Sequence, residues 1–286
     1  MKRLIVNADD LGLTPGVNRG IVRAFQEGIV TSTSLLVTGS AFEDGVALAR
    51  DFPALDVGLH LALVEEQAVL PPEALPTLVH GTGRLPGTKG EFLKRALLRR
   101  ISWDEVEREI AAQIARFQQT GLRLSHIDSH QHLHMFSPVF RIVTRLTRGM
   151  DRVWIRNSAG SWRKLPSVPT RRWFQRLGLN LVCRWARGSN NPPGLQMPDG
   201  MYGFEVGGCL TRSALAQILR QIPDGFYELS CHPGEGDEET RRRYGHWSYR
   251  WAEELEALTA PETRSLLQEQ KIELTSFARA QETSLR

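Results

Sequence analysis

The fold of this chain is decided by its first apolar run and the residues that follow it, Leu4-Ile5-Val6-Asn7-Ala8-Asp9-Asp10-Leu11-Gly12. Residues 4–8 are typical of a short buried strand, and two aspartates stand directly at its end. Thr14 and Pro15 then suit the N-cap and the first turn of a helix that ends at Gly28. The chain therefore begins with a strand, a pair of carboxylates and a helix.

The same order of strand and helix continues to the C-terminus. Further strands are predicted at residues 34–37, 57–63, 122–127, 153–156, 226–231 and 272–274, and further helices at 42–50, 103–118, 139–146 and 210–222. This alternation implies parallel strands joined by right-handed crossovers. Four of the strands end in residues that can bind a metal or move a proton, and in α/β barrels such residues gather at the carboxyl ends of the strands. We therefore expect one (β/α) barrel domain over residues 1–286, with seven or eight strands.

Composition narrows the class of protein. The chain has 286 residues, of which 41% are hydrophobic and 24% charged, as in ordinary globular domains. It has no apolar run of membrane-spanning length, and its first residues lack the long apolar stretch of a secretory signal. Three cysteines without a C-x-x-C spacing argue against a disulfide framework. We expect a cytoplasmic protein.

The positive charge is concentrated in one part of the chain. The net charge is +4, yet residues 152–198 hold no acid and nine bases, so the rest is net acidic. The nine are Arg152, Arg156, Arg163, Lys164, Arg171, Arg172, Arg176, Arg184 and Arg187. Within this run Trp173, Leu177, Leu181 and Trp185 recur every four residues. A basic amphipathic segment at about 160–190 suits peripheral contact with the inner membrane, a lipid tail or a second subunit of a homodimer; the alternative is an ordinary barrel helix packed on the core.

The adjacent carboxylates of Asp9 and Asp10 indicate chemistry more than structure. One of them alone could cap the following helix. Two together repel each other, and a bound cation relieves that repulsion. We expect the two to have unequal roles, one on a metal and one as a base. His60 stands in another predicted strand, where a lone histidine is usually a core residue unless other ligands converge on it.

The residues from Ser125 to His134 supply that convergence. Histidine or aspartate occupies every second position, as His126, Asp128, His130, His132 and His134. On an extended chain these side chains face one way. Imidazole suits zinc and its neighbours, while added carboxylate also admits magnesium. The histidines exceed one coordination shell, so some must orient ligands or face the substrate. The alternative is a polyhistidine surface loop.

His232 ends a predicted strand and is followed by Pro233-Gly234, which holds it on a rigid turn. Imidazole titrates near neutral pH, so His232 is a candidate general acid, and a plain turn histidine is the alternative. Cys231 beside it could be a nucleophile, although a small buried cysteine is the commoner case.

Taken together, these motifs resemble the YdjC-like carbohydrate deacetylase family, which includes chitooligosaccharide deacetylases. The matching stretches follow one another along nearly the whole chain, at 4–12, 28–34, 57–60, 126–134 and 231–234. The resemblance implies a (β/α) barrel of the glycoside hydrolase and deacetylase type. One departure is Gln131, where relatives often carry a further histidine.

The resemblance also implies roles for individual residues. It places one divalent metal ion, magnesium or zinc, on Asp10, His60 and His126. Asp9 then corresponds to the base and His232 to the acid. We assign substrate binding to three further residues, Asp128, His130 and Arg156.

The function that follows is removal of the acetyl group from an N-acetylated amino sugar, in an oligosaccharide or a glycolipid. Residues 69–76 resemble family members associated with hopanoid biosynthesis, which suggests a hopanoid-linked N-acetylglucosamine as one substrate. Two alternatives stay open: a metal-dependent phosphoesterase on the same scaffold, and a non-enzymatic, metal-stabilised module that binds an anionic membrane. Nucleic acid is not an expected partner, because the aromatic residues of the basic segment follow a helical period and do not form a stacking platform.

Overall fold

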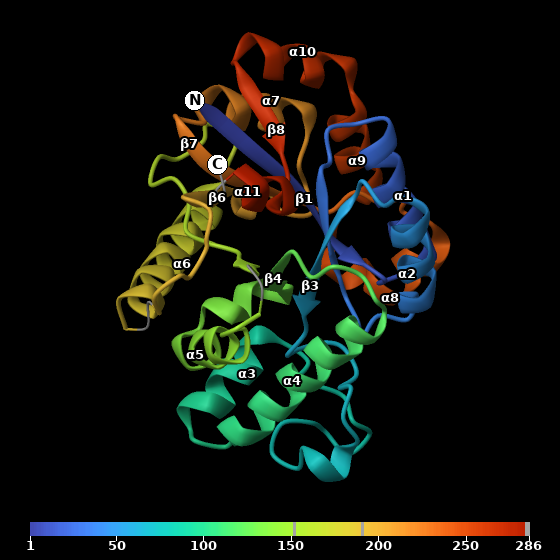
Figure 1. The fold of residues 1–286 in the computed structure, drawn as a ribbon, viewed down its shortest axis with the longest axis vertical. Helices are drawn as coiled ribbons and strands as arrows, with labels where there is room; N and C mark the ends of the chain where they lie inside the picture. Colours follow the sequence, from blue (N-terminus) through green and yellow to red (C-terminus); the bar gives the residue numbers. More distant parts are fainter. Residues whose placement is uncertain (151–152, 190–191, 284–286) are drawn as a thin grey trace.

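Eight parallel strands form the centre of the molecule in the computed structural model, which describes residues 1–150, 153–189 and 192–283 (Figure 1). Arg152 lies outside these ranges. The strands are β1 (Lys2–Leu11), β2 (Ser32–Leu35), β3 (Asp56–Leu61), β4 (His126–Ser129), β5 (Trp154–Ile155), β6 (Gly200–Tyr202), β7 (Gly225–Cys231) and β8 (Ile272–Thr275). Their order is β5-β4-β3-β2-β1-β7-β6, with β8 also paired to β1. The expected α/β fold of barrel type is confirmed, as an open barrel in which β5 and β6 are the ends of the described order.

Helices cover the outside of this sheet (Figure 1). They are α1 (Pro15–Gln26), α2 (Phe42–Asp51), α3 (Lys89–Leu97), α4 (Trp103–Gln119), α5 (Ser137–Leu146), α6 (Thr170–Ser189), α7 (Arg212–Gln221), α8 (Glu238–Tyr244), α9 (Trp251–Thr259), α10 (Pro261–Glu269) and α11 (Phe277–Thr283). The N-cap prediction is confirmed, because the Thr14 hydroxyl accepts a hydrogen bond from the Val17 amide. Over the described ranges, none of the helices combines the length and the apolar character needed to cross a membrane.

The long strand β1 organises the sheet. Its first half pairs with β8, its second half pairs with β2, and β7 runs beside it from Lys2 to Ala8. All of these pairings are parallel, so the carboxyl ends of the neighbouring strands meet at one edge. Asp9 and Asp10 therefore leave β1 in the middle of the sheet, with ligand-bearing strands on both sides.

The histidine-rich stretch does not stay extended. Strand β4 ends at Ser129, and the short 3-10 segment η2 (His130–Met135) follows it. Gln131 and His132 have left-handed backbones, with φ of 54° and 58°. The prediction that the alternation from His126 to His134 faces one way is therefore wrong beyond Ser129, and the later histidines project from a turn.

The basic segment forms the predicted helix, α6, but not a helix packed on the core by its large apolar residues. Its buried residues are Arg176, Asn180, Cys183 and Ala186. Arg156 and Arg176 are fully buried, so the nine bases do not form one basic surface.

Candidate metal centre and active site

Three side chains from different parts of the sheet edge converge on one point. Asp10 ends β1 with a left-handed backbone, φ 74°, His60 comes from β3, and His130 opens η2. Their ligand atoms lie within 4.8 Å of one another, and all three residues are buried. The Asp10 carboxylate is 3.3 Å from His60 Nε2 and 3.7 Å from His130 Nδ1. This is the geometry of an Asp–His–His metal set.

The remaining nitrogen of each imidazole is held by a carboxylate. His60 Nδ1 lies 2.8 Å from Asp128 Oδ1, and His130 Nε2 lies 2.8 Å from Glu65 Oε2. Histidines that bind metals usually have such a partner, because it fixes the ring and the tautomer. Each ring is thus oriented with its other nitrogen toward Asp10.

The surroundings of the Asp10 carboxylate indicate that a cation fits at this site. Both of its carboxylate oxygens are buried, and neither has a hydrogen-bond partner. Buried carboxylate oxygens are costly without a partner, and a divalent ion bound by oxygen and imidazole nitrogen would satisfy them. The residues present therefore fit a divalent metal, and their chemistry admits both zinc and magnesium.

Electrostatic interactions link these side chains. Burial lowers the pKa of His130, but the nearby Asp10 carboxylate and the Glu65 carboxylate to which it is hydrogen-bonded outweigh burial and raise the pKa to about 10. Burial works to raise the pKa of Asp10, while the neighbouring His130 and His60 bring it below its ordinary value. The carboxylate and the two imidazoles therefore stabilise each other's charged forms when no cation is bound.

His126 does not join this set. Its two ring nitrogens lie 3.0 Å from the Ser34 hydroxyl and 2.9 Å from the Ser125 hydroxyl, and its ring stacks on Phe277 at 4.0 Å. Burial lowers its pKa to about 3, so it is a neutral core residue. The predicted ligand set is thus corrected: the structure brings His130, four residues further on, to Asp10 and His60.

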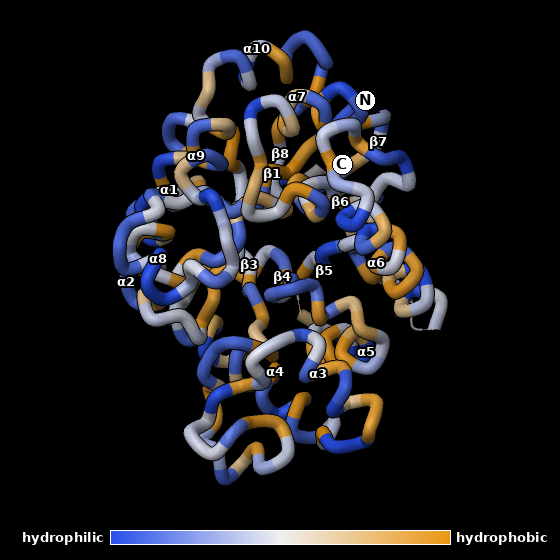
Figure 2. Tube along the Cα trace, turned by 180° about the vertical axis from the view of Figure 1, so that it is seen from behind, coloured by the Kyte–Doolittle hydropathy of each residue, from blue (hydrophilic) through white to orange (hydrophobic). Residues whose placement is uncertain are grey.

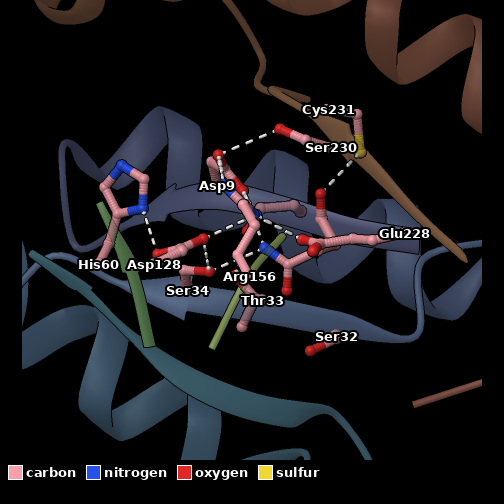
Figure 3. A network of polar contacts seen from close by, with 12 residues as sticks. Asp9, Ser32, Thr33, Ser34, His60, Asp128, Arg156, Glu228, Ser230 and Cys231 are labelled. Carbon is pink, nitrogen blue, oxygen red and sulfur yellow. Dashed lines mark hydrogen bonds and ion pairs between the residues drawn. The ribbon is translucent and has the colours of Figure 1, made fainter. Parts of the chain in front are cut away.

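Asp9 lies beside the centre in a network of buried charges (Figure 3). Arg156 donates to both of its carboxylate oxygens at 2.6 and 2.7 Å, and Ser230 donates to Oδ2 at 3.1 Å. Burial works to raise the pKa of Asp9, but the charge and the hydrogen bonds of Arg156 hold it well below the usual range. Asp9 is therefore ionised and fixed in orientation.

Arg156 has two further acidic partners. Its guanidinium contacts Asp128 at 2.6 Å and Glu228 at 2.7 Å, and Arg156 and Asp128 are fully buried. The structure thus places both residues in a buried network of charges and not among those that line the pocket, and their assignment to substrate binding stays a prediction. Asp128 orients His60, and Arg156 orients Asp9.

His232 follows β7 on the other side of Asp9. Its Nε2 is 3.9 Å from Asp9 Oδ2, and its Nδ1 is 3.9 Å from the buried Glu254. Glu254 also accepts the His232 amide at 2.6 Å, which fixes the turn. Cys231 is fully buried, its Sγ donates to the Asn7 carbonyl, and burial raises its pKa well above normal, so it is no nucleophile.

Some of these residues line a pocket of about 700 Å³. Asp9, His60, His130 and His232 are among its polar lining residues. Aromatic side chains of Phe204, Trp247 and Tyr249 and aliphatic side chains of Leu93, Leu97, Leu133, Leu179 and Val182 form its walls. The site can hold a small polar group against the metal centre and a larger apolar group beside it.

Several functional residues were not predicted. Glu65 and Glu254 each orient a histidine of the site, and Trp247 stacks against His130 at 4.8 Å. Each lies far in sequence from the histidine that it contacts, since Glu65 is 65 residues from His130 and Glu254 is 22 residues from His232. The one available signal was that Glu65 opens a long loop without periodicity, since such loops are often functional.

The fold and the site define an α/β barrel-type protein with a buried Asp–His–His centre at the carboxyl edge of its strands. The model of the family described as YdjC-like protein matches residues 3–269. The chain belongs to this family, as the resemblance of its motifs predicted.

Individual proteins similar to this chain are consistent with its place in the family. A carbohydrate deacetylase of Brevibacillus brevis is 32% identical over 280 residues, which cover 96% of this chain and 98% of that protein. A chitooligosaccharide deacetylase of Serratia marcescens is 32% identical, with 96% and 98% covered. A crystal structure of an Enterococcus faecalis protein assigned to cellobiose-phosphate cleavage superposes with a TM-score of 0.80 at 27% identity, and 98% of both chains is covered.

Proposed function

We propose that the protein is a metal-dependent deacetylase that removes the acetyl group from an N-acetylated amino sugar. One observation carries the proposal. Asp10, His60 and His130 converge beside a pocket, and His60 and His130 line this pocket together with Asp9 and His232. A metal set, an ionised carboxylate and an imidazole within reach of one substrate are the groups that amide hydrolysis needs. Relatives named carbohydrate deacetylases over nearly the full chain support the substrate class.

The chain's own residues divide the work. A divalent metal, when bound, polarises the acetyl carbonyl and lowers the pKa of water. Asp9 accepts the proton that the attacking water loses. Arg156 holds the carboxylate of Asp9 by both oxygens, so it stays ionised and aimed while substrate binds.

His232 serves the leaving group. The amide carbon–nitrogen bond breaks, and the amine departs only if its nitrogen gains a proton. His232 supplies this proton from the pocket side, where Glu254 fixes its position through the backbone. Acetate and the free amino sugar are the products.

The pocket walls suggest the finer substrate. Leu93 and Leu97 from α3 and Leu179 from α6 line the pocket, and a sugar alone would leave them without an apolar surface to contact. We extend the proposal to a glycolipid whose apolar part rests on these walls. A hopanoid-linked N-acetylglucosamine is one such substrate.

The test is mass spectrometry of an N-acetylglucosamine oligomer and an N-acetylglucosaminyl glycolipid incubated with metal-loaded protein. We expect loss of acetyl from the amino sugar, and a fall in kcat of about 10²- to 10⁴-fold for Asp9→Asn and for His232→Asn. Leu179→Gln should lower kcat/KM for the glycolipid and leave the oligomer unchanged. Failure of both substrates to lose acetyl contradicts the proposal.

The same incubation tests the phosphoesterase alternative. Lys89 and Arg172 line the pocket and would suit a phosphate group. Release of inorganic phosphate from a sugar phosphate, without release of acetate from the amino sugars, would replace the proposed reaction by phosphate-ester hydrolysis.

A further inference from the structure

Helix α6 exposes several of its large apolar residues. Phe174, Leu181 and Trp185 are each 61% exposed. The same helix buries an arginine and an asparagine, both held by hydrogen bonds to neighbouring loops. A helix that only had to pack on the barrel would place these residues the other way round, because apolar burial stabilises and exposure does not. Figure 2 shows this helix at the edge of the molecule, with hydrophobic residues between hydrophilic ones.

A second helix extends the exposed apolar surface. Leu97 and Leu98 at the end of α3 are 76% and 52% exposed. Leu97 lines the pocket together with Val182 of α6, so both helices border the pocket. We call this surface the α3–α6 face, defined by Leu97, Leu98, Phe174, Leu181, Val182 and Trp185. Large contiguous apolar surfaces are uncommon on monomers and mark places of contact.

Positive charge surrounds this face. Four exposed arginines lie on α6, namely Arg171, Arg172, Arg184 and Arg187. No ion pair joins any of them to an acid over the described residues, and no acid occurs in the sequence from 152 to 198. At the pocket mouth Lys89 is likewise without an acidic partner in these ranges, and the nearby charge of Arg172 contributes with burial to lowering its pKa. The positive charges around the α3–α6 face would therefore be complemented by an anionic partner.

We propose that the α3–α6 face binds the surface of an anionic lipid bilayer and turns the pocket mouth toward it. Tryptophan, phenylalanine and leucine side chains enter the boundary between headgroups and acyl chains, while the arginines contact lipid phosphates. The protein then lies on the membrane without crossing it. Vesicle binding needs no substrate, so this proposal stands or falls separately from the proposed reaction.

A second copy of the chain fits the face less well. In a two-fold dimer the same patch lies on both subunits. Arg171 and Arg184 of one copy would then face the same unpaired cations of the other, with no acid on α6 to separate them. An anionic bilayer offers the complementary charge instead.

The experiment is co-sedimentation of the full chain with vesicles of phosphatidylcholine containing phosphatidylglycerol and with vesicles of phosphatidylcholine alone. We expect binding to the anionic vesicles that weakens as salt is raised. Arg171→Glu combined with Arg184→Glu should lower the partition coefficient by roughly 25-fold or more, since each lost surface cation costs about fivefold. Leu181→Ser combined with Trp185→Ser should also lower it.

A matched control is Arg241→Glu combined with Arg242→Glu. These exposed arginines lie on α8, on the other side of the molecule from α6 (Figures 1 and 2). This variant carries the same change in net charge and should bind nearly as the parent does. Equal loss in both charge variants, or no binding by the parent, overturns the proposal. So does a dimer in light scattering that Leu181→Ser with Trp185→Ser converts to monomer without any effect on vesicle binding.

Discussion

Asp10 could be recognised as a candidate site residue from the sequence, whereas the role of His130 could not. The carboxylate pair at the end of β1 is recognisable because a buried strand seldom ends in two acids. His130 was recognisable as one of several histidines, but its role was not, because the left-handed backbones of Gln131 and His132 break the extended pattern on which the expectation rested. His126 lies in strand β4, and its ring is buried in the core, where it is hydrogen-bonded to the hydroxyl groups of Ser34 and Ser125.

This contrast yields a direct prediction for metal binding. His130→Gln should weaken binding of zinc by more than about 100-fold, because even the loss of a residue that only orients a ligand typically costs about 10- to 100-fold. His126→Gln should keep the metal affinity and lower the melting temperature, since it disturbs buried hydrogen bonds and the stack on Phe277. Calorimetric titration and thermal unfolding of both variants measure this. Equal metal affinity in His130→Gln and the parent would show that His130 is not a ligand, and His126 would again be the candidate.

Glu228 predicts a pH dependence of stability. Burial raises its pKa to about 7, and Arg156 opposes this only in part. A carboxyl group with a raised pKa binds its proton more tightly when folded. Its contribution to stability is therefore complete below the pKa of the unfolded chain and is lost as the pH rises through about 7.

Glu228→Gln removes this titration. Between pH 4.5 and 8 the free energy of unfolding of the parent should fall by about 3 kcal/mol more than that of the variant. Urea titrations at several pH values measure the difference. Glu273→Gln, at an exposed position of β8, serves as the control and should follow the parent. Parallel pH profiles for the parent and Glu228→Gln would show that Glu228 stays ionised in the folded protein.

Among the secondary-structure elements, the longer ones with a clear period were predicted, whereas strand β6 and the helices α3, α8, α9, α10 and α11 were not. The strands at β1, β3 and β7 and the amphipathic helices α1 and α4 follow their hydrophobic patterns. Strand β6 has three residues, too few for a pattern. Helix α6 was predicted as a helix, yet its orientation depends on Arg176 and Asn180 meeting loop carbonyls and Glu205, which no periodicity shows.

Gly58 gives a prediction for strand β3. A β-carbon at this position would come within 2.3 Å of the His126 ring, which is backed by Phe277 and cannot retreat. Gly58→Ala should therefore lower the free energy of unfolding by about 1–3 kcal/mol. Gly178→Ala in α6 is the matched comparison, because a β-carbon there meets nothing within 4 Å. It should stabilise the protein by about 0.5–1 kcal/mol, the usual gain of alanine over glycine in a helix. Chemical denaturation of both variants measures the contrast, and a neutral Gly58→Ala would mean that the ring can shift.

At the scale of the whole molecule, the candidate metal centre is built from segments that are far apart in the chain. Asp10, His60 and His130 come from β1, from β3 and from the turn after β4. These strands are joined laterally through the sheet, but the described order is open between β5 and β6. A metal bound by residues of β1, β3 and the turn after β4 should stabilise the folded chain, because it binds the folded state and not the unfolded chain.

Removal of metal should lower the melting temperature. A metal present at about 100 times its dissociation constant contributes about 2.7 kcal/mol, which for a chain of this size corresponds to about 4–5 °C. Unfolding scans after chelation, and after return of zinc, magnesium or manganese one at a time, measure the shift and rank the metals. Asp10→Asn should show no shift with any of them, because it removes the carboxylate whose two buried oxygens lack other partners. A shift of the same size in Asp10→Asn would place the stabilising ion elsewhere in the protein, and with it the centre on which the proposed reaction depends.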